Sequence, residues 1–239
     1  MNNKLAIIGG SGLTELQGLE IIKRQVVETP YGSSPVVYGI YNNQEIVFLA
    51  RHGAKHTIAP HKINYRANIW ALKQIGIKNI IAVAAVGSIN PAFKNTEIVI
   101  PHQIIDYTYS REHTFFDEEI VTHIDFTEPY CETLRQKLLV ATEAHSKAVH
   151  AVTQGPRLET AAEIDRLETD GADIVGMTGM PEAALARELE LCYACCAVIA
   201  NEAAGRGKAE ITMAEIETNL INGIAKVQTL LSNFIKMND

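Results

Sequence analysis

The stretch that decides the fold is FLARHGAKHTIAPHKINYRANIWALKQI, residues 48–75. It begins as an apolar strand at 48–50 and ends as a helix that carries Tyr65 and Trp70. Between them lie six cationic or imidazole side chains, Arg51, His52, Lys55, His56, His61 and Lys62. An open α/β sheet places its ligand site at the carboxyl ends of strands, and an arginine offers a planar fork for phosphate. We therefore expect an anion site here, in preference to the alternative of a solvated basic loop.

Composition indicates an ordinary globular protein. The 239 residues are 47% hydrophobic and 21% charged, with a formal net charge of −7. An acidic chain lacks the basic face that a sequence-independent nucleic-acid binder needs, so no nucleic-acid partner is expected. The N-terminus lacks a signal-peptide pattern and no apolar run reaches membrane-spanning length, so we expect a cytoplasmic protein with no membrane partner.

Three of the four cysteines, Cys192, Cys195 and Cys196, lie in the apolar run LCYACCAVIA, and Cys131 lies far upstream. Cys192 and Cys195 form a lone CxxC without a second pair or a nearby histidine, so a zinc site is not expected. Reduced, buried cysteines are the default for a cytoplasmic protein.

Strand and helix patterns alternate along the whole chain. Strands are expected at 4–8, at 36–50 as a hairpin around Asn42-Asn43, at 79–89, at 96–106 and across LCYACCAVIANEAAG. Helices are expected from Pro129, after Thr160 and after Thr212, the last two with the Thr-x-x-Glu capping-box spacing. The polar segment 107–125 reads as a long functional loop. The pattern predicts an α/β fold, a single domain over 1–239 with a large mixed twisted sheet flanked by helices.

Several motifs carry a resemblance to a known family. In chain order they are GGSGL, ARHG, AAVGSI, THIDFTEPYC, GPRLET, GMTGMPE and NEA. The chain resembles the trimeric purine nucleoside phosphorylases, in particular their methylthioadenosine phosphorylase branch. The Gly-rich turn at 9–12 is neither GxGxxG nor a P-loop, so dinucleotide and Walker interpretations fail. The resemblance implies cleavage of a purine nucleoside by inorganic phosphate, with no metal or organic cofactor.

The resemblance assigns phosphate binding to Ser11, Arg51, His52 and Thr178. A phosphate-binding threonine of many relatives is replaced here by Ala84, so only backbone N–H groups at Ala84 or Ala85 remain for that contact. The alternative for Thr178 is capping of the following helix. His56 matches a family histidine, whereas His61 is expected to be solvated.

The base and sugar fall to a second set of residues. Small residues at the end of the 79–89 strand would let a flat ring and a sugar lie against the backbone at Ala85, Val86 and Gly87, and the alternative is simply a tightly packed central strand. The resemblance places Met177 under the ribose, although a core methionine is its alternative. Asn201 and Glu159 match the residues that read a 6-oxopurine, and Arg51, His52, Glu159 and Asn201 are therefore the catalytic set. The alternative for Glu159 is an acid at a helix N-terminus.

Three departures from the family bear on the substrate. Ala203 replaces an aspartate of the methylthioadenosine enzymes, and Leu158 replaces an aromatic residue that stacks on the base. Met213 and Ile216 match the apolar methylthio pocket, or simply face the core. Glu217 is polar where an apolar residue is usual. Glu202 reads as a surface carboxylate.

His123 resembles the histidine that reaches across a subunit interface toward the 5′ group, and its alternative is an exposed loop histidine. A homotrimer is therefore expected. Our first hypothesis is phosphorolysis of 5′-methylthioinosine in purine salvage. The alternatives are a methylthioadenosine or general inosine/guanosine phosphorylase and, from another class, a nucleoside-binding or Rossmann-type protein without phosphorolysis.

Overall fold

The computed structural model describes residues 4–116, 121–207 and 210–237. Ten strands join in one mixed sheet in the order β2-β3-β4-β1-β5-β9-β8-β7, and β10 pairs with β5 and β6. The strands are β1 (Leu5–Gly9), β2 (Glu20–Thr29), β3 (Gly32–Tyr41), β4 (Gln44–Ala50), β5 (Asn79–Ser88), β6 (Ile98–Val99), β7 (Gln103–Asp106), β8 (Val149–Val152), β9 (Ile174–Gly176) and β10 (Cys192–Glu202). The α/β fold with a large mixed sheet is confirmed.

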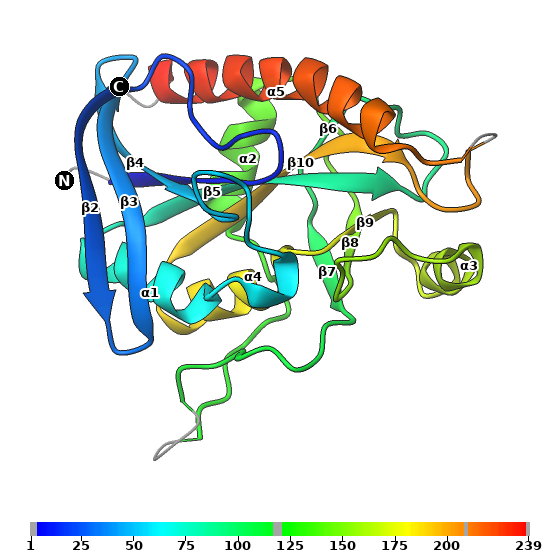
Figure 1. Cartoon of the computed structure of the whole chain (residues 1–239), viewed down its shortest axis with the longest axis horizontal. Coiled ribbons are helices and arrows are strands. Elements are labelled where there is room, and N and C mark those ends of the chain that lie inside the picture. Colours follow the sequence, from blue (N-terminus) through cyan, green and yellow to red (C-terminus); the bar gives the residue numbers. More distant parts are fainter. Residues whose placement is uncertain (1–3, 117–120, 208–209, 238–239) are drawn as a thin grey trace.

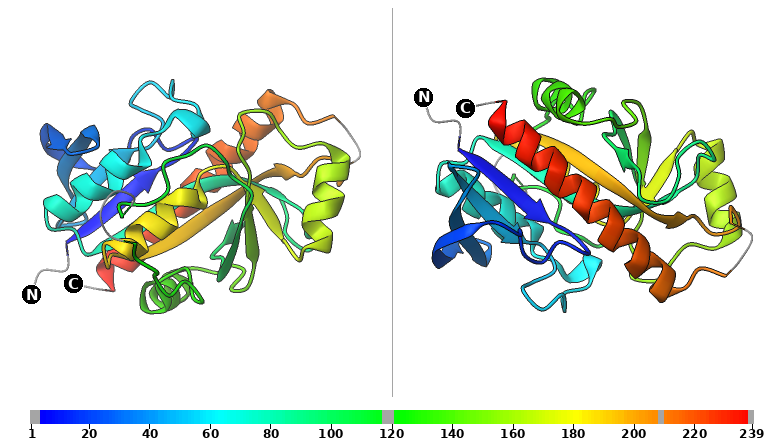
Figure 2. Two further views of the ribbon diagram at one scale, coloured as in Figure 1. Left: turned by 90° about the horizontal axis from the view of Figure 1, so that it is seen from below. Right: turned by 90° about the horizontal axis from the view of Figure 1, so that it is seen from above.

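Helices cover both faces of this sheet. They are α1 (Tyr65–Gln74), α2 (Glu132–Ala141), α3 (Ala161–Thr169), α4 (Gly179–Glu188) and α5 (Met213–Lys236), with a 3₁₀ turn at Pro60–Lys62. Figure 1 shows α5 along one side of the sheet and α1 with α4 along the other, while Figure 2 views these two sides in turn. The helix α3 packs at the far end, beside β7, β8 and β9.

Alternation along the central strands divides the core between the two sides. In β1, Ala6 and Ile8 join the cluster under α1 and α4, whereas Leu5 and Ile7 join the cluster under α2 and α5. Successive strand residues point to opposite faces, so a strand covered on both sides is apolar throughout. This explains why the sequences of β1, β5 and β10 read as continuous apolar runs.

The hairpin and the helix caps follow the sequence. Asn42 and Asn43 both have positive φ, at 49° and 65°, as a two-residue primed turn requires. Thr160 and Glu163 form the complete capping box of α3. Thr212 accepts a hydrogen bond from the Glu215 backbone N–H at the start of α5. The helix α5 buries one apolar face, which includes Leu220, Ile224, Val227 and Leu231.

Two element predictions were wrong. The single strand predicted over 96–106 is split into β6, which pairs with β10, and β7, which pairs with β8. Pro101 lies between them and has no N–H to donate to a ladder. The helix predicted from Pro129 begins only at Glu132, with Cys131 as its N-cap residue. The structure also adds β2, which the sequence pattern had not indicated.

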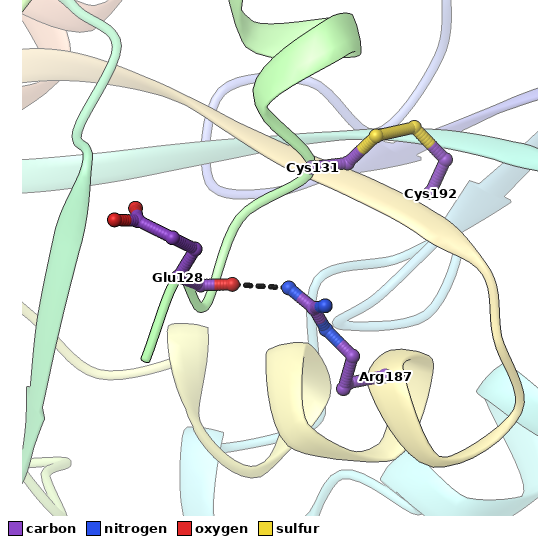
Figure 3. The surroundings of a disulfide bond; sticks show 4 residues. All are labelled: Glu128, Cys131, Arg187 and Cys192. Atoms are coloured by element: carbon purple, nitrogen blue, oxygen red, sulfur yellow. Dashed lines mark hydrogen bonds between the residues drawn. A yellow bond between two sulfur atoms is a disulfide. The ribbon is translucent and has the colours of Figure 1, made fainter. Parts of the chain in front are cut away.

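The prediction of four reduced cysteines was wrong for one pair. Cys131 and Cys192 form a disulfide, their Cα atoms 5.1 Å apart, although 61 residues separate them in sequence. Figure 3 shows the bond joining the start of α2 to the start of β10, near Arg187 of α4, which donates to the Glu128 carbonyl. The backbone N–H of Cys131 also donates to the Tyr193 carbonyl at 2.8 Å, which brings the two cysteines together. Cys195 and Cys196 are free and buried as expected.

Among the described residues, no helix is long and apolar enough to cross a membrane.

Candidate active site

The site opens where the sheet divides. The strand β1 follows β5 as far as the pair Ile8–Ala82, and β9 joins β5 only at Gly87. Between these points the backbone of β5 meets the loops that follow β1 and β4. Openings of this kind at the carboxyl ends of strands are where α/β sheets bind ligands.

A cavity of about 700 Å³ occupies this opening. It is lined by every residue that the sequence assigned to phosphate, namely Ser11, Arg51, His52, Ala84 and Thr178. It is also lined by most residues assigned to the nucleoside, namely Ala85, Val86, Gly87, Leu158, Glu159, Met177, Asn201, Ala203, Met213 and Ile216. The structure therefore gathers residues from seven separate stretches of the chain at one place.

The guanidinium of Arg51 was expected to be free to bind phosphate, but it already has protein partners. Its Nε and Nη2 donate to the two carboxylate oxygens of Glu182 at 2.7 and 2.8 Å, and its Nη1 donates to the Val83 carbonyl at 3.0 Å. Close packing against Gly10 brings Nη1 to 3.0 Å from where a Cβ at that glycine would lie. Arg51 thus reaches the cavity as one half of a buried ion pair, and its pKa is raised because Glu182 stabilises the cation against the cost of burial.

His52 and His56 form a pair of rings beside the Gly-rich turn, with centroids 4.7 Å apart. The Nδ1 of His52 lies 2.8 Å from the Ile58 carbonyl, so in the neutral ring Nδ1–H donates and Nε2 is left as an acceptor. Burial, together with the nearby cation of Arg51, lowers the pKa of His52 to about 4. His56 contacts the Ser11 hydroxyl at 3.0 Å, so this family histidine belongs to the site.

Thr178 is the N-cap residue of α4, but its hydroxyl makes no capping hydrogen bond. Because Thr178 is buried and lines the cavity, the hydroxyl is left for a ligand. Neighbouring Met177 is half-buried, packs against Gly155 and also lines the cavity, so it is not a core methionine.

The two residues predicted to read the base, Asn201 and Glu159, line the same cavity. The Asn201 amide is buried against Gly87, and its Nδ2 donates to the Glu202 carbonyl at 2.7 Å. Glu159 lies one residue before the N-cap of α3 and accepts from the Thr153 hydroxyl at 2.6 Å. That bond holds one carboxylate oxygen and leaves the second as an acceptor. An amide and a carboxylate together can both donate to and accept from a heterocycle.

The remaining wall is apolar and open. Met213, Ile216, Leu220 and Ile221 come from the first turns of α5, and Glu217 lies among them. Leu158, at the position where the family has an aromatic residue, is 41% exposed.

His123 lies outside the cavity, exposed in the loop after β7. It is the one predicted site residue that this chain does not bring to the others. Glu202 is exposed as expected, whereas His61 is half-buried and its Nδ1 has no partner among the described residues, so the prediction of a solvated side chain was wrong.

Sequence analysis missed two buried residues that shape the site. One is Glu182, which lies in the first turn of α4 and pairs with Arg51. Arg111, in the 107–125 loop, donates to the backbone carbonyls of Met177, Met180 and Gln154 at 2.6–2.9 Å. It thereby ties the loop to the segments that carry Met177 and Thr178. A single arginine within a polar loop gave no sign of this role.

Among the described residues, no cluster of three histidine, cysteine or acidic side chains is placed to hold a metal ion. The lone CxxC is accounted for, because Cys192 is bonded to Cys131.

Comparison with known proteins agrees with this geometry. A sequence model of the Phosphorylase superfamily matches residues 4–236. The chain is 56% identical over 239 residues to the probable S-methyl-5'-thioinosine phosphorylase of Pseudomonas syringae pv. tomato, covering 96% of this chain and 97% of that relative. It is 48% identical over 225 residues to the 6-oxopurine nucleoside phosphorylase of Pyrococcus furiosus, covering 89% and 84%.

Among solved structures, the methylthioadenosine phosphorylase of Schistosoma mansoni in complex with adenine superposes with a TM-score of 0.93 at 30% identity, covering 98% of this chain and 91% of that one. Family match, sequence relatives and fold all lead to the same conclusion: this chain belongs to the phosphorylase superfamily.

Proposed function

We propose that the protein cleaves a 6-oxopurine nucleoside with inorganic phosphate, and that S-methyl-5'-thioinosine is the substrate that it uses best. The products would be hypoxanthine and 5-methylthioribose 1-phosphate. One observation carries the proposal: a single cavity is lined by Arg51, His52 and Thr178 and also by Glu159 and Asn201. Membership of the phosphorylase superfamily and the names of the relatives support the same reaction.

In this scheme one group of residues binds phosphate and another group acts on the base. Phosphate is held beneath the anomeric carbon by Ser11, Arg51, His52 and Thr178, where the missing side-chain hydroxyl at Ala84 leaves backbone N–H groups as substitutes. The C–N bond breaks as the sugar gains oxocarbenium character, and phosphate adds to the opposite face. No protein nucleophile is needed, because positioning and preorganised hydrogen bonds lower the barrier. Met177 packs against the ribose.

Asn201 and Glu159 act on the leaving base. The amide of Asn201 donates to O6 and complements N7 as negative charge develops there. The free oxygen of Glu159 accepts N1–H, which hypoxanthine has and adenine lacks. No metal or organic cofactor takes part in this scheme, and phosphate is the co-substrate. The cytoplasmic location expected from the sequence remains a prediction.

A substrate panel tests the reaction class. Methylthioinosine, methylthioadenosine, inosine, guanosine and adenosine would each be incubated with and without phosphate, and free base would be measured. We expect release of hypoxanthine from methylthioinosine only with phosphate. A protein that binds nucleoside but never consumes phosphate would support the rival, a nucleoside-binding protein.

The choice of base is tested by the same panel. A site that leaves buried polar groups unpaired with the wrong ligand can reject it by roughly 10⁴-fold. We therefore expect methylthioinosine to be strongly preferred over methylthioadenosine. The double variant Asn201→Asp with Ala203→Asp should shift the ratio toward the 6-amino substrate, because carboxylates accept from that amine. Equal turnover of both nucleosides by the unmodified protein would refute the assignment.

A further inference from the structure

A buried carboxylate stands behind the phosphate end of the cavity. The side chains of Arg51 and Glu182 are 1% and 0% exposed, and they meet through two hydrogen bonds of 2.7 and 2.8 Å. Arg51 lines the cavity, whereas Glu182 does not. Glu182 therefore contacts Arg51 from outside the cavity lining.

Glu182 is itself held in place. It lies in the first turn of α4, and the Tyr193 hydroxyl of β10 donates to its Oε1 at 2.8 Å. Its two oxygens thus accept three hydrogen bonds, two from Arg51 and one from Tyr193. A carboxylate with this many partners has a fixed orientation, and it fixes the plane of the guanidinium in turn.

Counting donors shows what remains for a ligand. An arginine has five N–H groups. Glu182 takes two and the Val83 carbonyl takes one, which leaves one N–H on Nη1 and one on Nη2 among the described contacts. Two donors on adjacent nitrogens suit two oxygens of one tetrahedral anion.

We propose that Glu182 is a positioning residue for phosphate, which acts by holding Arg51 so that its two remaining N–H groups face the cavity. The inference rests on the proposed function, because it takes phosphate as the ligand of that end. Phosphate use therefore depends on a side chain that phosphate does not touch.

If only charge mattered, loss of Glu182 would strengthen phosphate binding instead of weakening it. Glu182 neutralises Arg51, so its removal would leave a buried cation unpaired and strengthen the attraction for an anion. Orientation and charge thus make contrary predictions, and the direction of the change decides between them.

The decisive variant is Glu182→Gln, which keeps the shape and removes the second acceptor oxygen. We expect the KM for phosphate to rise about 10-fold or more, while the KM for methylthioinosine stays within about twofold. Titration of inorganic phosphate by calorimetry should show the same loss without any nucleoside. A phosphate KM that is unchanged or lower would overturn the proposal.

Tyr193→Phe keeps the charge pair and removes only the third hydrogen bond. It should raise the phosphate KM about threefold with the nucleoside KM unchanged. If Glu182→Gln does not fold, this variant decides alone, and an unchanged phosphate KM would count against the proposal. Failure of the proposed function is distinguishable, since the wild type would then show no phosphate-dependent turnover while calorimetry still reports phosphate binding.

A matched control lies on α2. Glu132 pairs with the buried Arg135 at 2.6 Å, also across a carboxylate–guanidinium contact, and neither residue lines the cavity. Glu132→Gln should lower stability and leave the phosphate KM within about twofold. If Glu132→Gln raised the phosphate KM as much as Glu182→Gln does, loss of any carboxylate–guanidinium pair would be sufficient to weaken phosphate use. That result would overturn the positioning role of Glu182.

Discussion

The two ends of the cavity are built differently. At the phosphate end, Arg51, His52 and Thr178 are all buried, and Arg51 already has protein partners at 2.7–3.0 Å. At the end formed by α5, Met213 and Ile221 line the same cavity but are 65% and 73% exposed. One end is complete within a single chain, whereas the other presents apolar side chains without a cover.

This difference suits the different demands of binding phosphate and binding the 5′ group of the nucleoside. A fixed set of donors costs little reorganisation when phosphate binds, which is what a reaction driven by positioning requires. Exposed apolar side chains gain from burial when an apolar 5′ group, or another chain, covers them. The loop after β7 carries the predicted interface residue His123, which is exposed and available for such a role.

Arg51→Ala should have the largest effect, because it removes the central contact of the buried end. Loss of a charge-assisted contact of about 1.5–3 kcal/mol raises the phosphate KM roughly 10–100-fold and leaves purine binding nearly intact. Stability should fall by about 3–5 kcal/mol, since Glu182 becomes an unpaired buried anion. Steady-state kinetics and urea unfolding measure the two effects. Normal phosphate saturation would contradict the phosphate role.

A second variant separates the two consequences. Arg51→Met with Glu182→Leu removes both charges, so stability should recover relative to Arg51→Ala. Phosphate use should not recover.

Comparison of methylthioinosine with inosine tests whether the exposed α5 end recognises an apolar 5′ group. In our proposal the thiomethyl group contacts Met213 and Ile216, and one such apolar group changes kcat/KM by about 10–200-fold. We expect methylthioinosine to be the better substrate by about 10-fold, the low end of this range, because Glu217 lies among the apolar side chains. Glu217→Leu should increase the preference. If inosine is used equally well, a general nucleoside phosphorylase replaces our assignment.

We expect a second copy of the chain to cover the exposed side chains of α5. We expect a homotrimer in which His123 of one copy reaches the 5′ group bound by its neighbour. His123→Ala should weaken discrimination among 5′ groups by several-fold, on the order of one hydrogen bond, and leave hypoxanthine affinity unchanged. Light scattering gives the assembly and the nucleoside panel gives the discrimination. A fully active monomer would refute both.

The sequence predicted the residues that line the cavity better than it predicted their partners. Strand-end motifs such as ARHG and GPRLET place side chains at the sheet edge, because a strand delivers whatever follows it to that edge. The pairing of Arg51 with Glu182 joins residues 131 apart in sequence, and the disulfide joins residues 61 apart. Neither separation leaves a local periodic signal, so only the folded chain reveals them.

The missed strand has a similar cause. In β2, EIIKRQVVET, most side chains are exposed, and Ile21 and Val26 are apolar without being buried. Period-two alternation between core and solvent is therefore absent, and the strand exists through its pairing with β3.

A further expected effect concerns the acid stability of the buried phosphate end. Burial beside Arg51 and His56 lowers the pKa of His52 from 6.5 to about 4 in the folded chain. Between these pH values the unfolded chain binds the extra proton, so stability should fall as pH decreases from about 6.5 to 4, by at most about 1.4 kcal/mol per pH unit for this group. Buried His150, whose pKa is also about 4, adds a slope of the same sign. His52→Gln should lose the His52 part of this slope, and bound phosphate should flatten the wild-type curve because an adjacent anion favours the His52 cation. Urea unfolding at intervals across this range measures the slopes. Identical slopes in wild type and His52→Gln would show that the pKa of His52 is not lowered in the folded protein. The phosphate end would then differ less from the exposed α5 wall than we infer.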